Sequence, residues 1–140
     1  MKDLYHNYLP KVAALPVLVT DDTSGNGTGV DLYGYQGALM IASIGAVGDL
    51  FDGSNYVTIK FLESSNNVVF SAIADEDLIG GNNTVVVNAN AEANCIHYRA
   101  YVGSAQYVTI SFDVTGTMAN GTPMSALIVK GFPIHAPAVA

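Results

Sequence analysis

A strict alternation of apolar and polar residues runs through Tyr107–Thr115, with the sequence Y-V-T-I-S-F-D-V-T. Every even position from Val108 to Val114 is apolar, and each odd position from Thr109 onward carries Thr, Ser or Asp. Successive side chains of a β-strand point to opposite faces, and Thr, Val and Ile are poor helix formers. The segment therefore predicts a half-buried central strand with one dry row and one polar row.

Two other segments predict strands that are buried differently. In Tyr56–Glu63 the odd positions from Val57 to Phe61 are apolar and point one way, and the hairpin partner follows at Val68–Ala72. Gly37–Ile44, G-A-L-M-I-A-S-I, is apolar on both faces. Such a strand fits the centre of a sandwich, or a strand with one face against another subunit.

Two further strands are less regular. Pro16 interrupts Val12–Thr20, and because proline cannot donate to a ladder, this segment predicts an edge strand or a strand broken at that point. In Ile96–Val102 the apolar even positions share one side, and His97, Arg99 and Tyr101 share the other, which we expect to face solvent. The short link Gly103–Gln106 predicts an antiparallel hairpin with the alternating strand that follows.

The pattern as a whole predicts an all-β fold. About eight or nine short strands are separated by turns rich in Gly, Asn, Asp and Ser, and no segment sustains a helical period over about 11 residues. We expect an antiparallel β-sandwich or a jelly-roll-like barrel with extended terminal arms. The 140 residues suit a single domain at 11–132, after an N-terminal arm at 1–10 and before a C-terminal tail at 133–140.

Composition narrows the partners that this domain can bind. Only 12% of the residues are charged, against about 25% in ordinary domains, which suggests that part of the surface is covered by another molecule. The net charge is −7, and the five basic residues are dispersed, so we expect no direct binding to nucleic acid and none to anionic membranes. The first residues, M-K-D-L-Y-H, lack the apolar core of a signal peptide, which predicts a soluble protein made in the cytoplasm.

Groups that could carry chemistry are scattered. Two loops hold possible oxygen ligands for a cation: Asp21, Asp22 and Asn26 in one, and Asp49, Asp52 and Asn55 in the other. Asp, Asn and Gly residues also form turns without any bound ion. Asp75–Asp77 suits a solvated acidic turn, and His6, His97 and His135 are too far apart in sequence to suggest a zinc site. We expect no enzymatic activity, no metal and no cofactor.

The lone Cys95 excludes an intrachain disulfide, and we favour a small buried hydrophobe over an intermolecular bridge. The apolar arm either packs back on the core of its own chain or reaches a neighbouring chain. Candidate contacts with other chains are Leu4, Tyr5 and Tyr8 in the arm, then Leu39 and Ile41 on one face of the doubly apolar strand. Exposed aromatic residues could instead bind carbohydrate, and the candidates for that are Tyr33, Tyr35 and Tyr101.

Short motifs spread over most of the chain resemble a family of small proteins encoded in the head-gene region of tailed bacteriophages. The motifs are K-D-L-Y (Lys2–Tyr5), V-D-L (Val30–Leu32), L-E-S-S (Leu62–Ser65), D-L-I-G (Asp77–Gly80), Y-R-A-Y-V (Tyr98–Val102), V-T-I (Val108–Ile110) and A-L-I-V-K-G (Ala126–Gly131). Chains of that family often end in a short basic tail, whereas this one ends F-P-I-H-A-P-A-V-A.

The resemblance implies a β-sandwich or jelly-roll virion protein that decorates and cements the capsid. Its partners would be the major capsid protein and copies of itself, in a homo-oligomer located in the virion. The alternatives are a head–tail connector or tail component, and a carbohydrate-binding sandwich module.

Overall fold

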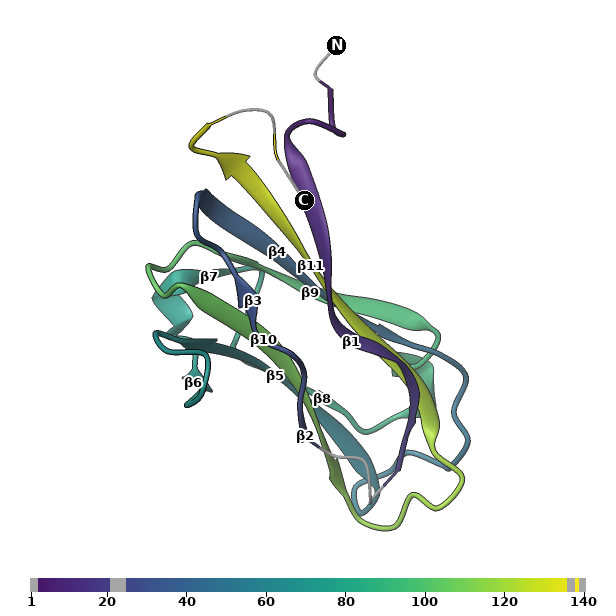
Figure 1. The fold of residues 1–140 in the computed structure, drawn as a ribbon. Helices are drawn as coiled ribbons and strands as arrows, with labels where there is room; N and C mark the ends of the chain where they lie inside the picture. The colour runs from purple at the N-terminus through teal and green to yellow at the C-terminus, as the bar shows by residue number, and fades with distance from the viewer. Residues whose placement is uncertain (1–2, 21–24, 136–137, 139–140) are drawn as a thin grey trace.

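The computed structural model describes residues 3–20, 25–135 and 138, and its fold is an antiparallel β-sandwich of two sheets, as predicted (Figure 1). Sheet A has the strand order β1 (Tyr8–Val19), β11 (Thr122–Pro133), β4 (Tyr35–Ile44), β9 (Cys95–Tyr101) and β7 (Leu78–Ile79). Sheet B has the order β2 (Gly25–Asn26), β10 (Tyr107–Thr115), β5 (Tyr56–Ser64) and β6 (Ser71–Ala72), with β3 (Val30–Asp31) paired to β10 and β8 (Thr84–Val87) paired to β5. Two 3₁₀ turns, η1 (Asp75–Asp77) and η2 (Asn90–Glu92), lie in the connections.

The predicted central strand is β10, which lies between β5 and the short strands β2 and β3. Its dry row is confirmed, because Val108, Ile110 and Phe112 are buried in the core between the sheets. The polar row differs from the prediction, since Thr109 and Ser111 are also buried. Their hydroxyls donate to main-chain oxygens of the Gly25–Thr28 segment, so that a polar row is buried without loss of hydrogen bonds.

The core-facing side of sheet A is built on β4 and β11. Residues directly opposite each other in a ladder share a face, and Met40 of β4 pairs with Ile128 of β11. Both side chains are fully buried. Along β4, Met40 lies between Leu39 and Ile41, which are half-buried and point the other way. One apolar row of this strand therefore lies in the core, as expected, whereas its other apolar row is only half-buried on the outer side of sheet A.

Strand β1 is an edge strand of sheet A, as the proline predicted. Pro16 lies inside one of two register irregularities, between Ala14 and Val17. In the other irregularity, between Val12 and Ala14, the Ala13 carbonyl accepts a 2.7 Å hydrogen bond from the Thr28 amide, which ties this edge to the segment that flanks β10. The strand starts at Tyr8, so the last residues of the expected arm belong to the sheet.

The predicted hairpin between β9 and β10 is wrong, because β9 belongs to sheet A and β10 to sheet B. The link Gly103–Gln106 crosses from one sheet to the other around the Tyr101 side chain, whose hydroxyl accepts a 2.8 Å hydrogen bond from the Ala105 amide. A Cβ on Gly103 would come within 2.5 Å of the Tyr101 oxygen, so this link needs a glycine.

Candidate functional site

Apolar side chains cover the side of sheet A that faces away from sheet B. In one cross-strand row Val12 pairs with Leu127, and Leu127 pairs with Ile41. Ile41 in turn pairs with Tyr98 of β9, and because opposite residues share a face, the row crosses four strands. We call this surface the apolar face; it consists of Pro10, Val12, Leu39, Ile41, Ile79, Ile96, Tyr98, Ala100, Leu127 and Val129.

Several members of the apolar face are well exposed, among them Val12 at 55%, Ile96 at 56% and Tyr98 at 54%. The strands of sheet A contain no Asp or Glu. Their Lys and Arg residues pair with core-facing positions, since Arg99 lies opposite Met40 and Lys130 opposite Ala38. The outward side of this sheet therefore carries no charge at its paired positions.

The facing predicted for β9 is wrong. His97, Arg99 and Tyr101 point inward, and the apolar row with Ile96 and Tyr98 points outward. The inward polar groups find partners at the margin of the sandwich. The Arg99 guanidinium lies 5.4 Å from the centre of the Phe61 ring and donates to the Asn82 and Tyr98 carbonyls. These hydrogen bonds allow β9 to point its polar row inward and its apolar row outward, the reverse of what its alternation alone predicts.

The structure places Leu39 and Ile41, two of the predicted contact residues, on the apolar face. Tyr8 lies at its end, over Gly131, where a Cβ would come within 2.9 Å of the Tyr8 ring. An apolar hollow of about 300 Å³ opens beside that ring, lined among others by Leu39, Val129 and Phe132. Leu4 and Tyr5 are exposed in the turn before β1 and border a second, larger hollow that also reaches Val129.

The outward side of sheet B is polar. In one row Lys60 pairs with Ser111, and in the next Thr58 pairs with Asp113. The Lys60 ammonium forms an ion pair with the Asp113 carboxylate. This surface satisfies its polar groups within the chain.

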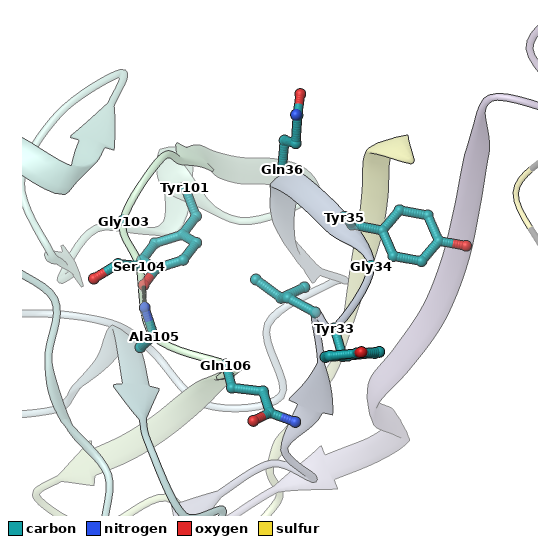
Figure 2. A pocket seen from close by; sticks show the side chains of 11 residues that line it. Tyr33, Gly34, Tyr35, Gln36, Tyr101, Gly103, Ser104, Ala105 and Gln106 are labelled. Carbon is teal, nitrogen blue, oxygen red and sulfur yellow. Dashed lines mark hydrogen bonds between the residues drawn. The ribbon is translucent and has the colours of Figure 1, made fainter. Parts of the chain in front are cut away.

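A more polar pocket of about 420 Å³ lies where the turn before β4 meets the link after β9 (Figure 2). It brings together Tyr33, Tyr35 and Tyr101, the candidates for carbohydrate binding, with Gln106 among the polar lining. The tyrosine rings differ in how accessible they are to a ligand, since Tyr33 is 82% exposed and Tyr101 is buried. The Tyr35 ring lies 4.3 Å from the Lys130 ammonium and points away from Tyr101 (Figure 2).

Two ionisable groups near this pocket have shifted pKa values. Burial raises the pKa of the Tyr101 phenol, and so does its 2.6 Å hydrogen bond to the Glu63 carboxylate. Burial lowers the pKa of Lys130, with a contribution from the Lys11 charge, although the nearby Asp31 acts in the opposite direction. The Lys130 ammonium also donates to the Asp31 carbonyl at 3.0 Å. Both groups connect strands: Tyr101 of β9 bonds to Glu63 of β5, and Lys130 of β11 bonds to Asp31 of β3.

Two of the carboxylates considered for a cation bond to main-chain amides, Asp49 across to another loop and Asp52 within its own turn. Asp49 accepts hydrogen bonds from the amides of Asn120 and Gly121, and Asp52 accepts from those of Ser54 and Asn55, which lowers the pKa of Asp52. Asp21 and Asp22 lie outside the described residues. Elsewhere in the described chain, no three or more His, Cys, Asp or Glu side chains come together as a metal site would need.

Cys95 is half-buried instead of fully buried, and its thiol donates a 2.7 Å hydrogen bond to the Glu92 carbonyl. It is a free cysteine. Among the described residues, none of the helices is long and apolar enough to cross a membrane.

No protein-family model matches the sequence, and a comparison with curated proteins found no match. One similar solved structure is described as "Bacillus endospore appendages form a novel family of disulfide-linked pili". The two chains are 13% identical, with a TM-score of 0.47 over 91% of this chain and 89% of that chain. Similarity at this level does not indicate a shared function.

Proposed function

We propose that this protein is a non-enzymatic structural subunit of a phage virion, which binds the outside of the capsid and stabilises it. The observation that carries the proposal is the apolar face, an uncharged surface that crosses all five strands of sheet A. Isolated exposed apolar residues are ordinary on soluble proteins, but large contiguous apolar patches mark interaction sites. The order of short motifs that resemble phage head proteins supports the capsid as the place of assembly.

The mechanism is assembly. Apolar strand surfaces pack against neighbouring chains, and each copy connects adjacent capsid subunits. Leu4 and Tyr5 lie exposed next to the edge strand β1 and provide a second contact surface, at the end of the molecule where β1 begins and β11 ends (Figure 1). A decorating subunit needs at least two such surfaces, since it must hold neighbours together.

Quantitative gel analysis of purified particles tests this role. We expect a copy number comparable to that of the major capsid protein, and particles without this protein should release their genome at a lower temperature. A copy number that fits a single ring would favour a connector or tail component instead. Absence from purified particles would contradict the proposal.

A carbohydrate-binding module is the second candidate, favoured by the pocket of Figure 2. Tyr33 presents an exposed ring there, and the side chains of Gln36, Ser104 and Gln106 add donors and acceptors. Stacking on an aromatic ring beside amide groups is a common way to hold a sugar, but only one of the pocket's tyrosine rings is well exposed. Binding on a glycan array that is lost in Tyr33→Ala would support this candidate.

A further inference from the structure

We propose that the apolar face is covered by a second copy of this chain, which packs sheet A against sheet A in a two-fold dimer. The inference deepens the proposed function and rests on it, because it names the partner of the surface that carries that function. Three properties of the face favour this occupant: its size, its lack of charge and its sheet geometry.

The size of the outward side of sheet A, which carries the apolar face, suits a stable interface. The four long strands of sheet A contain 7 to 12 residues each. At about 3.3 Å per residue and 4.8 Å per strand, they cover roughly 650 Å² in projection, and side-chain relief adds to the accessible area. A standard interface buries about 800 Å² per partner. The outward side of sheet A, which carries the apolar face at its middle, therefore spans most of the area that a dimer needs.

The charge distribution favours a copy of the same chain. Each chain carries a net charge of −7, so two copies repel each other unless they meet where the charge is absent. The paired outward positions of sheet A are the uncharged surface, because Arg99 and Lys130 face inward and its strands contain no acid. Like charges are thus kept away from the contact.

The geometry also suits a symmetric contact. Apolar faces of twisted sheets stack about 10 Å apart with their strands roughly aligned. In a two-fold dimer each copy supplies the same patch to the other, which is the commonest form of homo-oligomer. The hollow beside Tyr8, with a volume of about 300 Å³, leaves room for a protruding side chain of the partner.

Sedimentation equilibrium of the full chain tests this inference, with one acidic substitution on each outer surface. Leu127 is 37% exposed at the middle of the apolar face, and Val86, which pairs with Thr58 on the outward side of sheet B, is 45% exposed. We expect the wild type to have twice the chain mass. Leu127→Glu should raise the dimer dissociation constant on the order of a hundredfold, because two carboxylates then enter the interface. Val86→Glu should leave that constant unchanged.

Circular dichroism melting checks that each variant is folded. If Leu127→Glu does not fold, Tyr98→Asp replaces it, because the Tyr98 side chain is more exposed and the fold depends on it less. A wild type that stays monomeric, or equal weakening by Val86→Glu, would overturn the inference. A monomer that is still abundant on particles would refute the dimer and leave the virion role intact. A dimer that is absent from particles would refute the virion role and leave the dimer intact.

Discussion

The outer faces of the two sheets follow the same two-residue alternation and have opposite chemistry. Outside sheet A, Leu39, Ile41 and Tyr98 form an apolar and uncharged surface. Outside sheet B, Lys60 and Asp113 form an ion pair on a surface rich in Thr and Ser. Both sheets cover the same core, so the core does not explain the difference. The difference supports the proposal that the outer face of sheet B meets water and that of sheet A meets protein.

Sheet B completes its outer face from within the chain. Thr109 donates to the Thr28 carbonyl at 3.0 Å, and Ser111 donates to the Gly25 carbonyl at 3.1 Å. Polar groups that are already paired gain little from a partner, whereas exposed apolar area gains free energy when it leaves water. We therefore expect substitutions on the two faces to act on different properties: on folding at sheet B, and on association at sheet A.

The largest effect is expected from a charge placed in the core. Ile110→Asp buries a carboxylate at a fully buried position of β10, which should cost more than about 4 kcal/mol and abolish soluble folded protein. Ile41→Asp, on the apolar face, should fold and lose association. Soluble yield and thermal melting measure the first effect, and sedimentation measures the second. An unchanged melting temperature in Ile110→Asp would contradict the assignment of that row to the core.

A smaller effect is expected where sheet A joins sheet B through Tyr101. Tyr101→Phe removes the hydroxyl that donates to Glu63 and accepts from Ala105, which should cost about 1–3 kcal/mol in a urea denaturation experiment. Because the pKa of Tyr101 is raised in the folded state, the folded protein holds the phenolic proton more tightly than the unfolded chain does. The resulting stabilisation is complete below the ordinary value of 10.0 and is lost as the pH rises above it.

The melting temperature of the wild type should therefore fall more steeply above pH 10.0 than that of Tyr101→Phe. Tyr33→Phe provides the matched control, because Tyr33 lies in the same pocket and is exposed. Equal slopes for the wild type and Tyr101→Phe would contradict the raised pKa of Tyr101 in the folded state.

Thr109→Val tests the buried polar row of sheet B. The substitution keeps the shape of the side chain and removes its hydrogen bond to Thr28, so we expect a loss of about 1 kcal/mol in the free energy of unfolding. Dimerisation should be unchanged, because the residue lies far from the apolar face in the other sheet. A gain in stability would mean that the row is held by packing alone.

The smallest effect is expected from the ion pair on the same surface. Lys60→Met keeps most of the side chain and removes the charge that pairs with Asp113. Exposed ion pairs contribute about 0–1 kcal/mol, and salt screens them. We expect a change within that range that disappears at high salt. A large loss that persists at high salt would show that Lys60 stabilises sheet B by other means.

The strands themselves could be predicted from the sequence, because alternation is a local property. Tyr107–Thr115 coincides with β10, and the doubly apolar Gly37–Ile44 lies within β4. Pro16 predicted an edge strand or a broken one, and β1 is an edge strand with a register irregularity at that proline. Leu39 and Ile41 were placed on one face of their strand by the same reasoning, and they lie on the outer face of sheet A.

The facing of β9 could not be read in the same way. In its sequence the apolar residues Ile96 and Tyr98 alternate with His97 and Arg99, and alternation alone assigns the apolar row to the core. In the structure, partners distant in the sequence set the orientation instead, because the Arg99 guanidinium lies over the Phe61 ring and donates to the Asn82 carbonyl. The false hairpin has a similar cause, since a link of a few residues can either turn within a sheet or cross between sheets. The extent of the apolar face therefore appears only when the strands are placed side by side.

Hydroxyl-radical footprinting of tyrosine side chains tests most directly whether the apolar face is covered in the assembled protein. Tyr98 lies on that face and Tyr33 lies in the pocket at its margin, and both are exposed in the single chain. We predict that Tyr98 is protected in the wild type and becomes reactive in Leu127→Glu, while Tyr33 reacts alike in both. Equal reactivity of Tyr98 in the two proteins would mean that the face meets water, and would contradict the account.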